Sequence, residues 1–73
     1  MRIKIYGKPN CPYCVKAKDL AETKNIVYEY IDLTENPDIL KEMKEAGHKS
    51  VPIIYEETEG LIGGFVELYK YVN

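Results

Sequence analysis

The only two cysteines of this 73-residue chain, Cys11 and Cys14, stand where one sequence pattern gives way to another. Residues 2–6 alternate strictly between polar or aromatic and aliphatic side chains, which predicts a strand, and the Gly- and Pro-containing residues 7–10 predict a loop. A proline between the cysteines suits the first turn of a helix, and residues 13–24 contain neither Gly nor Pro. We therefore predict a helix that begins beside the cysteines.

A second strand and a second helix follow in the chain. Residues 26–32 are rich in β-branched and aromatic side chains and predict a strand. A strand, a helix and a strand in so short a segment are typical of a right-handed βαβ unit with parallel strands. Asn36-Pro37-Asp38 has the features of a helix start, and Gly47 those of a helix end. The apolar face of this second helix would consist of Ile39, Leu40, Met43 and Ala46.

The C-terminal third of the chain predicts a hairpin and a last helix. Residues 51–55 form the third predicted strand, and the turn at residues 56–60 is short enough to make a fourth strand at 61–62 antiparallel to it. After Gly63-Gly64, apolar side chains recur with helical spacing. They are Phe65, Leu68, Tyr69 and Val72.

The predicted order is β-α-β-α-β-β-α, an α/β fold with a central four-stranded mixed sheet flanked by three helices. Helices on the sheet faces would bury all three apolar stripes. The chain length and the 45% hydrophobic content fit a single domain that spans residues 1–73. The stripe of the first helix would comprise Cys14, Ala17 and Ala21 with Val15 and Leu20 alongside. Core or sheet-face positions are expected for Tyr28, Tyr30, Tyr55, Tyr69 and Tyr71.

Charge and hydropathy exclude several classes of function. The net charge is -2, and no basic stripe interleaves with aromatic residues, so we expect no nucleic-acid partner. Residues 1–24 nevertheless carry a net +4 and residues 25–73 a net -6, which makes the cysteine-bearing end basic. No apolar run approaches the roughly 18 residues of a membrane span, and the first four residues do not resemble a signal peptide. We therefore expect a cytoplasmic protein without a membrane partner.

The positions of the two cysteines predict different roles for them. Cys11 falls at the N-terminus of a helix, where unpaired N–H groups and the helix dipole favour an anion, so its thiolate should form more readily than that of a free cysteine. Lys8 adds to this effect. Cys14 follows one turn deeper on the same side, within disulfide reach. The pattern predicts Cys11 as an outer nucleophile and Cys14 as an inner resolving thiol.

A Cys-x-x-Cys pair could also be half of a zinc site or a pair of inert buried thiols. A zinc site needs two more ligands, but the chain has no third cysteine and a single histidine, His48. Pro12 between the cysteines, with Lys8 and Asn10 before them, argues against burial of the pair. Redox chemistry without a metal is the reading that a βαβ context favours.

Three motifs of the chain resemble those of glutaredoxins, a branch of the thioredoxin-like superfamily. They are Cys11-Pro12-Tyr13-Cys14 after the first strand, Ser50-Val51-Pro52 before the third strand and Gly63-Gly64 before the last helix. Their order and spacing fit over nearly the whole chain. It resembles a minimal, short form that lacks an N-terminal extension and most of what often follows the last helix.

The resemblance implies a substrate groove around the dithiol. It implies a cis peptide bond before Pro52, which would place the backbone of Val51 opposite Cys11, where it could pair with a disulfide-bearing peptide or with glutathione. Tyr13 would flank this groove. The remaining implied contacts to glutathione are Lys8 and Lys49 at its glycyl carboxylate and Gly63 and Gly64 at its glutamyl end. The sequence departs from the family pattern after the glycines, where Phe65 and Val66 precede the one acidic residue, Glu67.

The resemblance implies a thiol-disulfide oxidoreductase that reduces protein or glutathione mixed disulfides, with glutathione as co-substrate and no tightly bound cofactor. The implied partners of this monomer are disulfide-bearing proteins such as ribonucleotide reductase, with glutathione reductase or thioredoxin reductase as the electron source. Three alternatives stay open. They are a glutathione-independent redoxin reduced by thioredoxin reductase, a [2Fe-2S] carrier in which Cys11 of two subunits and glutathione hold the cluster, and a non-catalytic binding module.

Overall fold

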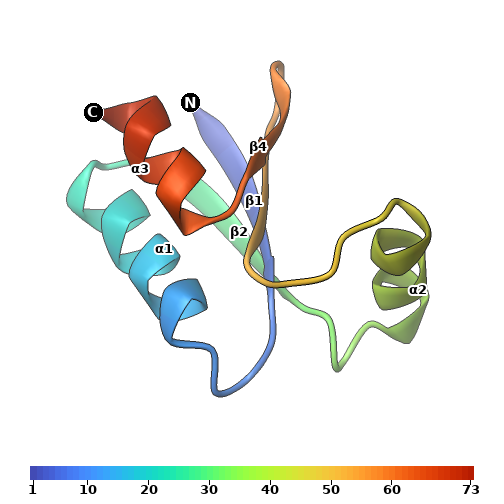
Figure 1. Ribbon diagram of the computed structural model, residues 1–73. Coiled ribbons are helices and arrows are strands. Elements are labelled where there is room, and N and C mark those ends of the chain that lie inside the picture. Colours follow the sequence, from blue (N-terminus) through green and yellow to red (C-terminus); the bar gives the residue numbers. More distant parts are fainter.

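The computed structural model describes residues 1–73 and contains four strands and three helices (Figure 1). In chain order they are β1 (Arg2–Gly7), α1 (Pro12–Thr23), β2 (Val27–Asp32), α2 (Pro37–Glu45), β3 (Ile53–Glu56), β4 (Gly60–Gly63) and α3 (Phe65–Val72). The predicted order of elements is therefore confirmed, with boundaries that shift by one or two residues.

The strands form one mixed sheet in the order β2-β1-β3-β4. Strands β1 and β2 are parallel, as a βαβ unit requires, and β3 pairs antiparallel with both β1 and β4. The third strand begins at Ile53, later than expected, because residues 51 and 52 make no ladder pair with β1. Those two residues are thereby left at the end of the sheet where α1 begins (Figure 1).

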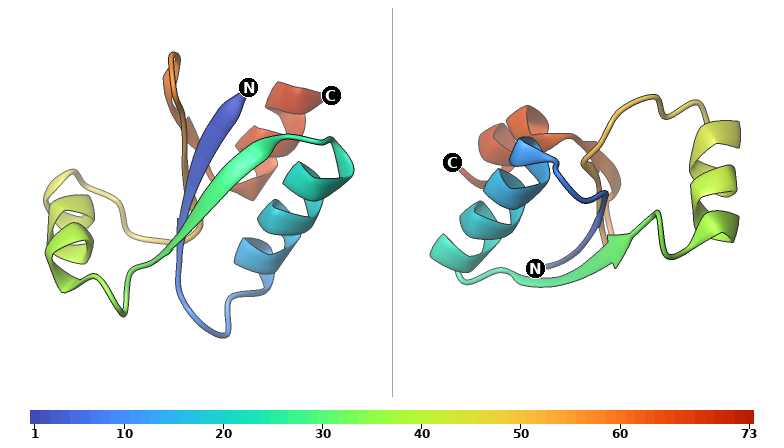
Figure 2. Two further views of the ribbon diagram at one scale, coloured as in Figure 1. Left: turned by 180° about the vertical axis from the view of Figure 1, so that it is seen from behind. Right: turned by 90° about the horizontal axis from the view of Figure 1, so that it is seen from below.

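The core lies between the sheet and the helices α1 and α3, which cover the same sheet face (Figure 2). Alternate residues of β1 point toward it, since Ile3 and Ile5 are buried while their neighbours Arg2 and Lys4 are exposed. Full burial of one such aliphatic side chain stabilises the fold by about 1.5–3 kcal/mol. The six buried residues of this core are Ile3, Ile5, Ala17, Ala21, Ile54 and Leu68.

Three side chains that were expected inside lie at the surface instead. Val15 is 50% exposed, Tyr69 53% and Tyr71 47%. Because only one narrow stripe of a short helix can face the sheet, α1 buries Cys14 and its two core alanines, and α3 buries a single residue. The expectations for Val15, Tyr69 and Tyr71 are therefore wrong.

Helix α2 lies on the opposite side of the sheet from α1 and α3 and stands apart from it (Figure 2). Pro37 occupies its first turn and Asp38 follows there, as the sequence predicted. None of its residues is buried, and Leu40 and Met43 are only half-buried. The expectation that all three helices bury their apolar stripes is wrong for α2, because the apolar side chains of this helix are at most half-buried.

No helix in the structure combines the length and the apolar character that a membrane span requires.

Candidate active site

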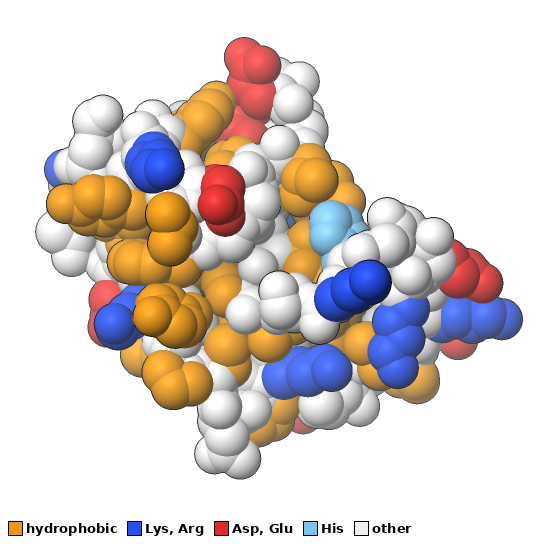
Figure 3. Space-filling model, viewed as in Figure 1, with side chains coloured by type: hydrophobic (Ala, Val, Ile, Leu, Met, Phe, Trp, Pro, Cys, Tyr) orange, Lys and Arg blue, Asp and Glu red, His pale blue; other side chains and the backbone are white.

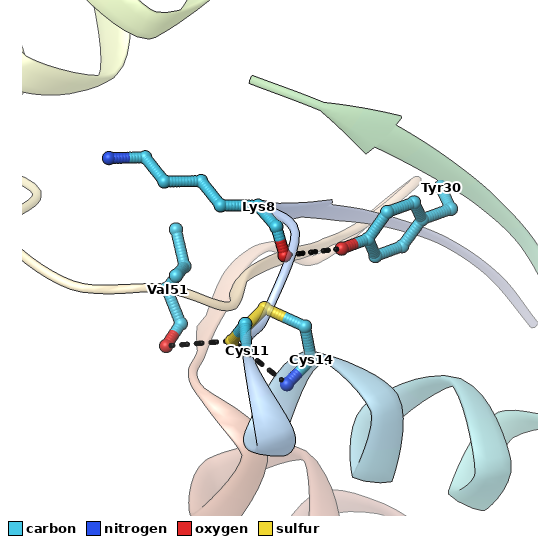
Figure 4. The surroundings of a disulfide bond; sticks show 5 residues. All are labelled: Lys8, Cys11, Cys14, Tyr30 and Val51. Atoms are coloured by element: carbon cyan, nitrogen blue, oxygen red, sulfur yellow. Dashed lines mark hydrogen bonds between the residues drawn. A yellow bond between two sulfur atoms is a disulfide. The ribbon is translucent and has the colours of Figure 1, made fainter. Parts of the chain in front are cut away.

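A disulfide joins Cys11 and Cys14 at the N-terminus of α1 (Figure 4). The two Cα atoms are 5.2 Å apart, within the usual range for a disulfide. The two sulfurs differ in access: Cys14 is 1% exposed, whereas Cys11 is half-buried. This difference matches the predicted arrangement of an outer and an inner thiol.

The start of α1 is built to hold negative charge on the outer sulfur. Cys11 is the N-cap residue, and the backbone N–H of Cys14 donates a hydrogen bond to its Sγ over 3.1 Å. Pro12 occupies the first turn, and no acidic residue is present there to oppose an anion. When the disulfide is reduced, this N–H group and the helix dipole both stabilise a thiolate at Cys11.

The loop before β3 faces the dithiol. The Val51–Pro52 peptide bond is cis, as the family resemblance implied, and the carbonyl oxygen of Val51 lies 3.9 Å from Cys11 Sγ (Figure 4). Neither the N–H nor the C=O of Val51 makes a backbone hydrogen bond within the chain. The donor and the acceptor of Val51 thus have no backbone partner beside the outer sulfur, and an extended peptide could pair with both.

The sulfur of Cys14 lies directly against Gly7, a contact that the sequence did not predict. Gly7, expected as part of a loop, is the buried last residue of β1. A Cβ atom at this position would lie 2.8 Å from the sulfur of Cys14 and would also overlap the hydroxyl of Tyr30. Gly7 thereby allows a close approach of β1, β2 and α1 under the disulfide, and a glycine that follows a predicted strand was the only signal for it.

Tyr30 was expected as a core or sheet-face residue, and its ring does pack against the core. Its hydroxyl donates to the carbonyl oxygen of Lys8 over 3.5 Å, which connects β2 to the loop that carries the dithiol (Figure 4). Burial, and secondarily the carboxylate of Asp32, raises the pKa of Tyr30 above its usual value, so the hydroxyl stays protonated and remains a donor. The ammonium group of Lys18 lies 4.2 Å from the ring centroid.

The two glycines before α3 close the other side of the site. Gly63 has a φ of +128°, which a residue with a side chain rarely adopts. Gly64 lies beside Pro52, since a Cβ on Gly64 would be in ordinary van der Waals contact, at 3.5 Å, with the carbonyl oxygen of Pro52. The N–H of Gly64 donates to a carboxylate oxygen of Glu67 over 2.8 Å. Glu67 therefore caps α3 from its first turn, a role that the sequence analysis did not assign to it.

The structure places the other predicted site residues on two sides of the dithiol. Tyr13, 53% exposed, contacts Phe65 of α3 with ring centroids 5.9 Å apart, and the ammonium group of Lys16 lies 4.9 Å from the Tyr13 ring. Lys8 and Lys49 lie on the opposite side, where both line a groove together with Val51. No cluster of three or more His, Cys, Asp or Glu side chains that could hold a metal ion is present.

A dithiol at the head of α1, opposite a cis-proline and on a sheet of order β2-β1-β3-β4, defines a redox protein of the thioredoxin-like fold. The family model for glutaredoxin matches residues 3–60. The chain belongs to the glutaredoxin family, whose members are thiol-disulfide oxidoreductases.

Individual relatives agree with this assignment. Glutaredoxin 1 of Escherichia coli K12 is 31% identical over an alignment of 81 positions, which covers the whole chain and 94% of that protein. Glutaredoxin 1 of Rickettsia felis is 45% identical over 54 residues, 70% of this chain, and the match spans only about half (53%) of that longer protein. Among solved structures, the glutaredoxin-like NrdH-redoxin of E. coli superposes with a TM-score of 0.86, covering all of this chain and 96% of that one, and its 22% identity supports the fold alone.

Proposed function

We propose that this protein reduces protein disulfides and glutathione mixed disulfides, with Cys11 as the nucleophile and glutathione as the electron donor. The observation that carries the proposal is the position of Cys11 Sγ, which accepts a hydrogen bond from the N–H of Cys14 at 3.1 Å and faces the backbone of Val51, which makes no backbone hydrogen bond within the chain. The N–H of Cys14 stabilises a thiolate at Cys11 from one side, and the sulfur is open to a substrate on the side of Val51.

The reaction consists of two thiol-disulfide exchanges. The Cys11 thiolate attacks one sulfur of the substrate disulfide and forms a mixed disulfide, and the other substrate sulfur leaves as a thiolate with the electron pair of the broken bond. Cys14 then loses its proton, and its thiolate attacks Cys11 Sγ. The second substrate thiolate leaves, so the substrate has gained two electrons and the protein holds the Cys11–Cys14 disulfide of Figure 4. Two molecules of glutathione reverse these exchanges and become glutathione disulfide.

The groove around the dithiol offers groups for each part of glutathione. In this proposal Val51 binds the cysteinyl backbone, while Tyr13 flanks it and Pro52 holds the loop. Lys8 and Lys49 attract the glycyl carboxylate. The backbone at Gly63 and Gly64 receives the glutamyl end, close to the carboxylate of Glu67. Phe65 and Val66 supply no charge there, which leaves Glu67 to serve both as the helix cap and as a partner for the glutathione amino group.

A glutathione-independent redoxin is the second candidate, because Val66 stands on the glutamyl side at a position where the family usually has a polar or acidic residue. The NrdH-redoxin of similar fold is described as glutaredoxin-like with a thioredoxin-like activity profile. In either case we propose a monomer in the cytoplasm, where the reducing surroundings favour disulfide reduction. Ribonucleotide reductase is a candidate protein substrate.

Two coupled assays distinguish these candidates. The first measures reduction of a glutathione mixed disulfide with glutathione, glutathione reductase and NADPH, and the second replaces glutathione and its reductase with thioredoxin reductase. Our proposal predicts NADPH consumption in the first assay. Turnover in the second assay alone would contradict glutathione dependence and support the redoxin.

A further inference from the structure

A groove separates α2 from the end of the sheet next to the dithiol. Its volume is about 450 Å³, within the range of about 300–1,000 Å³ that is common for ligand sites. The buried side chains of Leu33 and Ile53 contribute to its floor, and the half-buried Leu40 and Met43 of α2 form its far wall. Leu40 and Met43 belong to the apolar face of α2, which does not pack against the core.

The rim of this groove is basic. Lys8, Lys44 and Lys49 line it, and none of its ten lining residues is acidic. Figure 3 shows Lys or Arg side chains crossing from the body of the protein to α2 beside hydrophobic atoms. His48 also lines the groove, and its Nε2 is 3.1 Å from the hydroxyl of Tyr55, which ties the connection after α2 to β3. An apolar floor with a cationic rim suits an occupant that is apolar at one point and anionic around it.

The groove is continuous with the place where a substrate would bind. Val51 lines it and has its carbonyl oxygen 3.9 Å from Cys11 Sγ. An extended chain that pairs with Val51 advances by about 3.3 Å per residue and turns alternate side chains to the same face. A side chain within about three residues of the reacting cysteine would therefore reach the groove.

We propose that this groove binds an acidic segment of a disulfide-bearing protein substrate. An apolar side chain close to the substrate cysteine enters between Met43 and the floor, and neighbouring carboxylates lie against Lys44 and Lys49. The inference rests on the proposed function and names the class of protein substrate for the same exchange reaction. Lys44, Leu40 and Met43 extend the site beyond the residues assigned above to glutathione.

Peptide disulfides test this preference directly. The acidic probe is a peptide with one cysteine, a leucine two residues away and three flanking glutamates, joined as a mixed disulfide to 5-thio-2-nitrobenzoate. A second probe has lysines in place of the glutamates, and a third replaces the peptide with 2-mercaptoethanol. The Cys11 thiolate attacks the peptide or mercaptoethanol sulfur, and the coloured nitrobenzoate thiolate leaves with the electron pair. The second-order rate constant is measured with pre-reduced protein and no glutathione.

Lys44→Gln and Lys41→Gln form a matched pair, since both remove one charge from α2 but only Lys44 lines the groove. We expect the wild-type protein to react about tenfold faster with the acidic peptide than with the basic one. Lys44→Gln should lower the rate constant for the acidic peptide about threefold and leave that for the mercaptoethanol probe unchanged. Lys41→Gln should change neither rate constant. Met43→Ser should lower the rate constants for both peptides, because it removes the apolar wall.

The outcomes separate the two proposals. Equal rates with both peptides, or equal effects of Lys44→Gln and Lys41→Gln, would overturn the groove while the mercaptoethanol probe still supports the proposed exchange. Failure of reduced protein to react with the mercaptoethanol probe would overturn the proposed function and the groove together. Circular dichroism of each variant confirms that α2 is intact before the rates are compared.

Discussion

Gly7 and Cys14 are so close that no side chain fits between them: a Cβ on Gly7 would lie 2.8 Å from the Cys14 sulfur, so one of the two residues would have to shift. The same atom would meet the hydroxyl of Tyr30 even more closely. The end of β1, the middle of β2 and the first turn of α1 therefore converge on a point directly beneath the disulfide.

This convergence predicts that Gly7→Ala destabilises the protein by about 1–3 kcal/mol, as overpacking of a dense site does. The change should also disturb the position of the inner thiol. Removal of the Tyr30 hydroxyl takes away the nearest obstacle, so Gly7→Ala should be less harmful in a Tyr30→Phe background. Urea unfolding of the wild type, both single variants and the double variant measures this coupling. Strictly additive effects would show that Gly7 and Tyr30 do not compete for the same space.

The N–H of Cys14 and the dipole of α1 predict a reactive thiolate at Cys11 in the reduced protein. The rate of alkylation by iodoacetamide should reach half its maximum at a pH below about 8.5, the value for a free cysteine. Cys14→Ser isolates the Cys11 reaction and serves as the variant for the measurement, because its backbone N–H is retained. A half-maximum at or above the free-cysteine value would contradict the stabilisation.

The division of labour between the thiols predicts a trapped intermediate. In Cys14→Ser the first exchange can occur but the second cannot, so incubation with glutathione disulfide should leave one glutathione attached to Cys11. Cys11→Ser should acquire far less, since the remaining thiol is only 1% exposed. Intact-protein mass spectrometry followed by peptide mapping locates the adduct. Equal labelling of the two variants would contradict the assignment of outer and inner thiols.

Glu56 provides a prediction about pH that does not involve the dithiol. Its carboxylate accepts hydrogen bonds from the N–H of Glu59 and from the hydroxyl and N–H of Thr58, and these bonds lower its pKa below the usual value. Since the folded-state pKa is the lower one, this stabilisation is present above the unfolded-state pKa and is lost as pH falls through the folded-state pKa. Glu56→Gln should therefore lower the urea midpoint at pH 7 more than at pH 3.

The neighbouring Glu57 gives the control for this experiment, because it is exposed and its side chain makes no hydrogen bond. Glu57→Gln should change the midpoint little at either pH. If both variants behaved alike, the hydrogen bonds in the β3–β4 turn would have no part in the acid sensitivity.

Local patterns predicted most of the fold. Three elements were predicted from residues that are neighbours in the chain. They are β1 from the alternation in residues 2–6, α1 from the proline after Cys11 and α2 from Asn36-Pro37-Asp38. The cis bond before Pro52 was predicted through the family resemblance, because an isolated Val-Pro pair carries no such information.

The features that the sequence did not predict depend on distant contacts. Tyr30 meets Gly7 only through the register in which β1 pairs with β2, and that register is not visible in either strand alone. The apolar face of α2 has the same spacing whether it packs on a sheet or lines a groove, so periodicity could not show that it stands apart. Glu67 acts as a cap at a helix whose N-cap is a glycine, which lacks the usual Ser or Thr signal.

Disulfide reduction by Cys11 with electrons from glutathione can be tested in a single assay. The most direct measurement is the steady-state reduction of a glutathione mixed disulfide by the wild type, Cys14→Ser and Cys11→Ser, coupled to NADPH through glutathione and glutathione reductase. We expect turnover by the wild type, measurable turnover by Cys14→Ser, and none above background by Cys11→Ser. Full activity of Cys11→Ser, or no glutathione-dependent activity in the wild type, would contradict the proposed function.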